Sequence, residues 1–104
     1  MQVAAVRLRD YLKSPCDLLK IDIEGAEIAV LIDCEECLSQ VARIFVEFHS
    51  FVGEPQRLDQ VLGVLARSGF RLFLQAGKSP ARPFLGAEEF LGMDGQLDIW
   101  GVRS

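Results

Sequence analysis

Four polar side chains that could act on a substrate stand at the ends of two apolar segments. Asp22 and Glu24 close the stretch LLKIDIE, and Glu47 and His49 close the stretch RIFVEFH. Carboxylates and an imidazole can take a proton from a hydroxyl group, and they can also hold a divalent cation. The sequence therefore predicts Asp22, Glu24 and His49 as candidate catalytic residues. Asp22, Glu47 and His49 are alternatively candidate ligands of a metal ion.

The alternation of residue types predicts that these groups share one face of a β-sheet. Lys20, Asp22 and Glu24 occupy every second position of their segment, and apolar residues occupy the positions between them. Successive side chains of a strand point to opposite faces. Because burying an unpaired carboxylate is unfavourable, the end of this strand should reach water or a ligand. Ligands of open α/β sheets bind at the carboxyl ends of the strands, where two neighbouring strands would bring all these groups to one rim.

The same residues, together with Lys20 and Glu27, could instead have structural roles. Lys20 is suited to a salt bridge with a neighbouring acid. Glu24 and Glu27 could cap the turn into the following helix, where negative charge is favoured. His49 could be a hydrogen-bonded histidine at a strand end. Asp22 is the residue for which the pattern most favours a functional role.

The elements that position these residues follow from the hydrophobic periodicity. Strand patterns rich in branched and aromatic residues cover 17–23, 43–49, 70–75 and 97–103. Helical spacing predicts one helix from Ala26 to about Val41, and a second from Pro55 to a left-handed stop at Gly69. A short strand with a helical turn over 6–13, and one helical turn over 87–90, complete the prediction.

This order of elements predicts an α/β fold. Strands that alternate with helices are usually parallel and joined by right-handed crossovers. The connection before 97–103 has no long helix, so the last strand is expected to be antiparallel in a mostly parallel sheet of about four strands. A chain of 104 residues forms one domain at most, so residues 1–104 are predicted to be a single domain.

Composition excludes several classes of protein. The net charge of −4 argues against a nucleic-acid partner. No apolar run is long enough to cross a bilayer and no signal peptide is recognisable, so a cytoplasmic protein without a membrane partner is expected. Cys34 and Cys37 form a C-x-x-C motif that falls late in the predicted helix and is expected to hold reduced thiols. The run GKS at 77–79 does not have the upstream glycine of a phosphate-binding loop.

The run DLLKIDIEGAEIAVL, with VRLRDYL before it and RIFVEFH after it, resembles the FkbM family of S-adenosylmethionine-dependent methyltransferases. The family pattern is a strand ending in K-I-D-x-E-G-x-E, followed by a strand with a glutamate. The resemblance implies a partial Rossmann-like fold, S-adenosylmethionine as cofactor and a hydroxyl group as methyl acceptor. It implies that the four strands are the fourth to seventh of a seven-stranded sheet. They would lie in the order first, second, fourth, third, with the last strand antiparallel.

The resemblance covers only the C-terminal half of such a catalytic domain. No G-x-G turn follows a strand in these residues, so the residues that bind the cofactor are unknown. The resemblance places Asp22 and Glu24 where they would face the cofactor and the acceptor. A truncated form without independent activity is expected. The alternatives are a noncatalytic binding or assembly module, and a methyltransferase completed by dimerisation or by a separate N-terminal half.

The same resemblance predicts self-association. In a complete domain the segment 17–23 would pair with the strand that precedes the glycine-rich turn. Without that strand it is an exposed apolar edge, which invites pairing with another chain. A homodimer joined near 17–23 is therefore expected.

Overall fold

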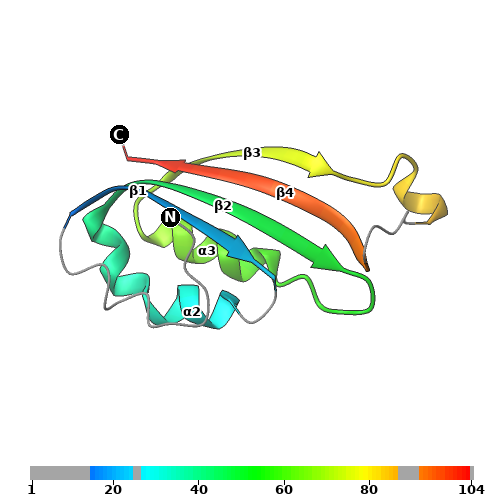
Figure 1. The fold of residues 1–104 in the computed structure, drawn as a ribbon, viewed down its shortest axis with the longest axis horizontal. Coiled ribbons are helices and arrows are strands. Elements are labelled where there is room, and N and C mark those ends of the chain that lie inside the picture. Colours follow the sequence, from blue (N-terminus) through cyan, green and yellow to red (C-terminus); the bar gives the residue numbers. More distant parts are fainter. Residues whose placement is uncertain (1–14, 25–26, 87–91, 104) are drawn as a thin grey trace.

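The computed structural model describes residues 15–24, 27–86 and 92–103 of the chain. Its centre is a four-stranded sheet with the strand order β1-β2-β4-β3 (Figure 1). All four predicted strands are present, as β1 (Cys16–Ile23), β2 (Val41–Phe51), β3 (Arg71–Lys78) and β4 (Met93–Val102). The elements predicted over 6–13 and 87–90 lie outside the described residues.

The sheet is mixed. β1 pairs with β2 in parallel, whereas β4 is antiparallel to both of its neighbours, β2 and β3. The predicted order of first, second, fourth, third strand is confirmed. The prediction of a mostly parallel sheet is wrong, because most of the strand pairings are antiparallel. The reversed strand, β4, lies inside the sheet between β2 and β3, so both of its pairings are antiparallel.

The first predicted helix is divided in two. The α-helix α2 (Glu27–Asp33) ends before Cys34, and a 3-10 helix, η1 (Glu35–Gln40), follows it. The amide of Cys37 donates to the carbonyl of Cys34, three residues back, which is the tighter turn of a 3-10 helix. This turn keeps Leu38 and Val41 fully buried while the chain reverses into β2. The thiol of Cys34 is also buried and donates to the carbonyl of Leu31, which supports a structural role for that cysteine.

The second predicted helix begins later than expected. α3 spans Leu58–Arg67, so Pro55 lies in the preceding loop. Arg57 has a left-handed backbone with φ of 57°, which holds the chain out of helical geometry until Leu58. Gly69, with φ of 95°, confirms the predicted left-handed stop. A last short 3-10 helix, η2, covers Pro83–Leu85, and Gly77 and Lys78 of the GKS run belong to β3.

The core lies between the helices and one face of the sheet. Figure 1 shows α2 and α3 on the same side of the sheet. The side chains that fill the space between them are almost completely buried: Leu19, Ile21 and Ile23 of β1, Ile44 and Val46 of β2, Ile99 of β4, and Val61, Val64 and Leu65 of α3. Because strand side chains alternate, the residues between these positions lie on the opposite, open face. Among the described residues, no helix is long and apolar enough to cross a membrane.

Candidate functional site

Strand pairing brings the predicted polar residues together on the open face. Asp22 and Glu47 are direct partners in the parallel pairing of β1 with β2. His49 follows two positions later in β2, so its side chain lies on the same face as that of Glu47. All three stand at the carboxyl ends of their strands, as the sequence pattern predicted. The roles assigned to them stay predictions.

The reactive atoms of these side chains lie close to one another. One ligand atom from each of Asp22, Glu47 and His49 lies within 4.8 Å of the others. His49 Nε2 is 3.6 Å from Glu47 Oε1 and 4.0 Å from Glu24 Oε1. The side chain of His49 is only 10% exposed, whereas that of Glu24 is 53% exposed. Glu24 therefore stands at the outer edge of the cluster, and the side chain of Glu27 lies outside the described residues.

A methionine fixes the orientation of the imidazole. His49 Nδ1 lies 3.1 Å from the Sδ atom of Met93, at the start of β4. A thioether sulfur has no proton to donate and only accepts hydrogen bonds. Nδ1 is therefore the donor in this contact, and Nε2 is the atom that faces the carboxylates. Sequence reasoning missed Met93 because the polar run that follows it, DGQ, has no strand periodicity.

The carboxyl groups of Asp22 and Glu47, both partly buried, dominate the electrostatics of the cluster. Partial burial raises the pKa of Glu47 above its usual value, and a hydrogen bond to Asp22 and the negative charge of Asp22 raise it further. The positive charges of His49 and Lys20 act in the opposite direction. The Nζ of Lys20 lies over the ring of Phe45, 5.7 Å from the ring centroid, and the salt bridge expected of Lys20 stays a prediction. Asp22 and Glu47 lie side by side in the register of β1 with β2.

Replacing Glu47 by glutamine is expected to stabilise the protein at neutral pH. The raised pKa means that the folded state holds the Glu47 proton more tightly than the unfolded chain does. The wild-type protein is thus penalised once the pH exceeds the raised pKa, and the penalty disappears as the pH falls toward the usual value of 4.5. We expect the melting temperature of E47Q to exceed that of wild type by about 2–4 °C at pH 7.

Thermal melts from pH 4 to pH 8 measure this difference. Glu36→Gln, which changes an exposed carboxylate of η1, is the control and should shift the melting temperature by no more than about 1 °C. A melting temperature of E47Q that is equal to or below that of wild type at pH 7 would contradict the electrostatic description of the site.

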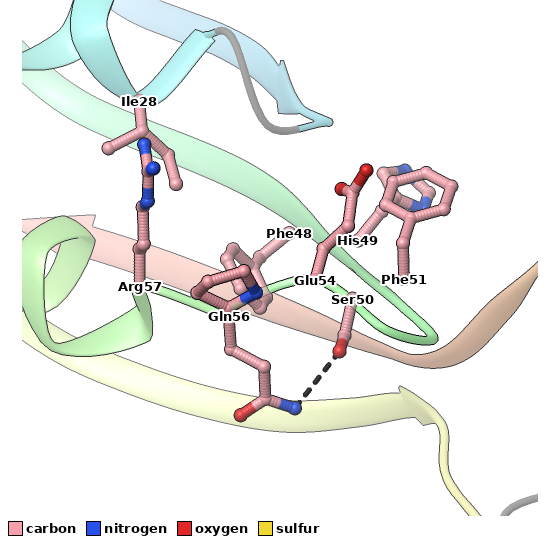
Figure 2. Close-up of a pocket in the computed structure, with 9 residues that line it drawn as sticks. Ile28, Phe48, His49, Ser50, Phe51, Glu54, Gln56 and Arg57 are labelled. Atoms are coloured by element: carbon pink, nitrogen blue, oxygen red, sulfur yellow. Dashed lines mark hydrogen bonds between the residues drawn. The ribbon is translucent and has the colours of Figure 1, made fainter.

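A cavity of about 320 Å³ opens beside His49 at the carboxyl end of β2 (Figure 2). In Figure 2, His49 and Phe51 lie at one end of the cavity and Arg57 and Ile28 at the other. The loop after β2 contributes most of the remaining wall, and Gln56 donates a hydrogen bond of 2.9 Å to Ser50 there. Sequence reasoning did not select Glu54 or Arg57. Their position in a polar loop directly after a strand end is the signal that could have indicated them.

Comparison with known families identifies the domain. A family model described as the methyltransferase FkbM domain matches residues 1–72. The chain belongs to the FkbM methyltransferase family. No curated protein matches the chain. The match includes Asp22, Glu47, His49 and the cavity loop, whereas β4 and its Met93 lie beyond the matched residues of this FkbM domain.

Proposed function

We propose that this chain supplies the part of an S-adenosylmethionine-dependent O-methyltransferase that binds and activates the methyl acceptor. The convergence of Asp22, Glu47 and His49 at the carboxyl ends of two neighbouring parallel strands carries this proposal. Membership of the FkbM family supports methyl transfer as the type of reaction. In this proposal the sheet is the second half of a Rossmann-like methyltransferase sheet, and β1 to β4 correspond to its fourth to seventh strands.

We call the cluster of Asp22, Glu47 and His49 at the carboxyl ends of β1 and β2 the rim. Its proposed chemistry is the removal of a proton from the hydroxyl group of the acceptor. A neutral hydroxyl group is a weak nucleophile, and it becomes a strong one as its proton leaves. Asp22 stands in the K-I-D-x-E motif and is the proposed base, and Glu24 and His49 would pass its proton on to solvent. S-adenosylmethionine would supply the methyl group as an electrophile. The acceptor oxygen would then bond to the methyl carbon as the carbon–sulfur bond breaks.

The cavity beside His49 is the proposed acceptor site. Its volume of about 320 Å³ is at the lower end of the range for small-molecule sites. Ile28 and Phe48 provide apolar wall, and Glu54 and Arg57 provide opposite charges. This lining suits a small polar molecule, such as a sugar or a hydroxylated metabolite. Its hydroxyl group would lie toward His49 and its other polar groups toward Arg57.

Residues outside these 104 are proposed to hold the cofactor. The described residues line the proposed acceptor cavity but include no glycine-rich turn after a strand. The proposal is tested by mixing this chain with the N-terminal half of an FkbM methyltransferase whose acceptor is known, and by measuring the release of S-adenosylhomocysteine. Methyl transfer by the mixture, and by neither part alone, is the expected result. Formation of a complex that transfers no methyl group would contradict the proposal.

We also propose that the chain self-associates. Self-association fits a methyltransferase part and a noncatalytic assembly module equally well. Among the described strands β1 lies at the edge of the sheet, and its Leu18 is 53% exposed. Phe73 and Trp100 are exposed on the open face, and no described helix covers them. An apolar edge and an apolar patch both favour pairing with a second chain. Light scattering should find a dimer at micromolar concentration that L18K disrupts without unfolding it. A wild-type monomer at every concentration would refute this.

A further inference from the structure

We propose that Asp22, Glu47 and His49 form a binding site for a divalent cation of the Mn²⁺ class. Two carboxylates and one imidazole supply oxygen and nitrogen ligands, and they leave further coordination positions open to water or to an acceptor oxygen. His49 is the single histidine of the chain. The site is therefore rich in oxygen, which favours Mn²⁺ or Mg²⁺ over the metals that prefer several imidazoles or thiolates.

The distances within the cluster suit one shared ion. Bonds to such an ion measure about 2.0–2.2 Å, so two of its ligand atoms lie up to about 4 Å apart. His49 Nε2 and Glu47 Oε1 are 3.6 Å apart, which already falls in that range. The widest separation in the cluster is within 4.8 Å, which a small rotation of a side chain closes. The pairing of Asp22 with Glu47 across β1 and β2 holds the two carboxylates on a rigid support.

The orientation of His49 suits a metal ligand. Nδ1 lies 3.1 Å from Met93 Sδ, and Nε2 lies 3.6 Å from Glu47 Oε1 and 4.0 Å from Glu24 Oε1. A thioether sulfur only accepts hydrogen bonds, so Nδ1 is the donor in that contact, and Nε2 is the nitrogen that a cation between the imidazole and the carboxylates would bind. Metal-binding histidines are usually oriented in this way, through a hydrogen bond from the other ring nitrogen.

The closeness of the two carboxyl groups points in the same direction. Asp22 and Glu47 are direct partners in the pairing of β1 with β2, and their ligand atoms lie within 4.8 Å of each other. Two carboxylates this close repel each other, and a divalent cation between them replaces that repulsion by attraction. Lys20 has its ammonium over the ring of Phe45, 5.7 Å from the ring centroid.

The bound cation would assist the reaction proposed above. An acceptor hydroxyl that binds the ion loses its proton more easily, because the ion stabilises the oxyanion that forms. This role rests on the proposed function, whereas binding of the ion does not. The two ideas are separated by measuring binding with neither cofactor nor acceptor present.

Titration of the purified chain with Mn²⁺, followed by electron paramagnetic resonance of the free ion at pH 7.5, tests the site. Wild type should bind one ion per chain, and E47Q and H49Q should bind at least about tenfold more weakly. Asp98 is the matched control, because it lies opposite Glu47 in the pairing of β2 with β4 and hydrogen-bonds Gln96 instead. D98N removes the same charge from the same face, and its affinity should stay within about threefold of wild type.

Three results would overturn the proposal. The first is that wild type shows no saturable binding at millimolar Mn²⁺. The second is that H49Q binds Mn²⁺ as tightly as wild type. The third is that D98N loses as much affinity for Mn²⁺ as E47Q does. The last result would indicate a diffuse attraction of cations to an acidic surface. Because E47Q is expected to melt above wild type, its loss of binding cannot be attributed to unfolding, and circular dichroism provides the same check for H49Q.

Discussion

Replacing Asp22 by asparagine is expected to lower methyl transfer by the assembled enzyme at least about 100-fold. Asparagine has nearly the same shape and can still hydrogen-bond to Glu47, so the pairing of β1 with β2 is preserved. It cannot accept a proton from the acceptor, and it is a poor ligand for a divalent cation. The loss should therefore appear in kcat, with little change in the melting temperature. The measurement is the rate of S-adenosylhomocysteine release in the mixture of this chain with an FkbM N-terminal half.

Asp98→Asn is again the matched control for this experiment. It changes a carboxylate of the same face that lies on β4 rather than on the parallel pair. We expect its rate to stay within about threefold of wild type, because Asp98 lies on β4, outside the cluster of Asp22, Glu47 and His49, and its carboxylate accepts a hydrogen bond from Gln96. A D22N enzyme that retains more than a third of the wild-type rate would remove Asp22 from the chemistry. An equal loss in D98N would show that the overall charge of the face matters and not the position of Asp22.

Replacing Arg103 by methionine is expected to produce the largest loss of stability. The guanidinium donates to the carbonyls of Val41, Ser68 and Leu38 at 2.8, 2.7 and 2.5 Å, respectively. It also stacks over Phe70, with 4.3 Å between the guanidinium carbon and the ring centroid. These bonds join the end of β4 to η1, to the start of β2 and to the end of α3. Methionine fills similar volume but removes the side-chain donor from three carbonyls, of which that of Leu38 keeps the amide of Val41 as a donor.

We expect R103M to lower the free energy of unfolding by about 3 kcal/mol, since one unsatisfied buried acceptor costs about 1–3 kcal/mol and the three share one side chain. In a domain of this size the melting temperature should fall by more than about 10 °C. Arg71→Met, at an exposed position of β3, serves as the control and should change stability by no more than about 0.5 kcal/mol. Equal melting temperatures for R103M and R71M would show that the Arg103 network contributes little.

The sequence predicted the rim of the site because two strands have a strict alternation. Apolar Ile21 and Val46 mark the buried face, and the charged residues between such positions can only lie on the other. The register that places Asp22 beside Glu47 follows from the apolar core, because a shift of either strand by one residue would turn its carboxylate toward the core. Fold class and strand order were thus accessible from the chain, the order with the help of the family resemblance.

Tertiary contacts determined the features that the sequence did not predict. Cys34, Leu38 and Val41 have a spacing that suits an α-helix and a 3-10 turn equally, so the break after Asp33 has no local signal. Met93 joins β4 only because β2 offers a partner for a run without apolar alternation. Arg57 adopts a left-handed backbone that its residue type does not indicate. The cavity wall formed by the loop after β2 therefore had to be seen in the structure.

The two carboxyl groups of the rim also affect the stability of the fold. Two carboxyl groups in direct register, one of which has its pKa raised by burial and by the other, oppose folding at neutral pH. Residues that favour stability would be easy to place at these positions of an α/β sheet, where apolar side chains are usual. Destabilising groups are retained where a function requires them, which agrees with a catalytic or metal-binding role for this pair.

Calorimetric titration with S-adenosylhomocysteine tests the central claim most directly. We assign binding of the methyl acceptor to these residues and binding of the cofactor to residues outside them. We therefore expect no heat of binding for this chain alone at millimolar ligand, and micromolar binding after an FkbM N-terminal half is added. Micromolar binding by the chain alone would contradict this division. An assembled pair that binds no S-adenosylhomocysteine would contradict the assignment of the rim to a methyltransferase site.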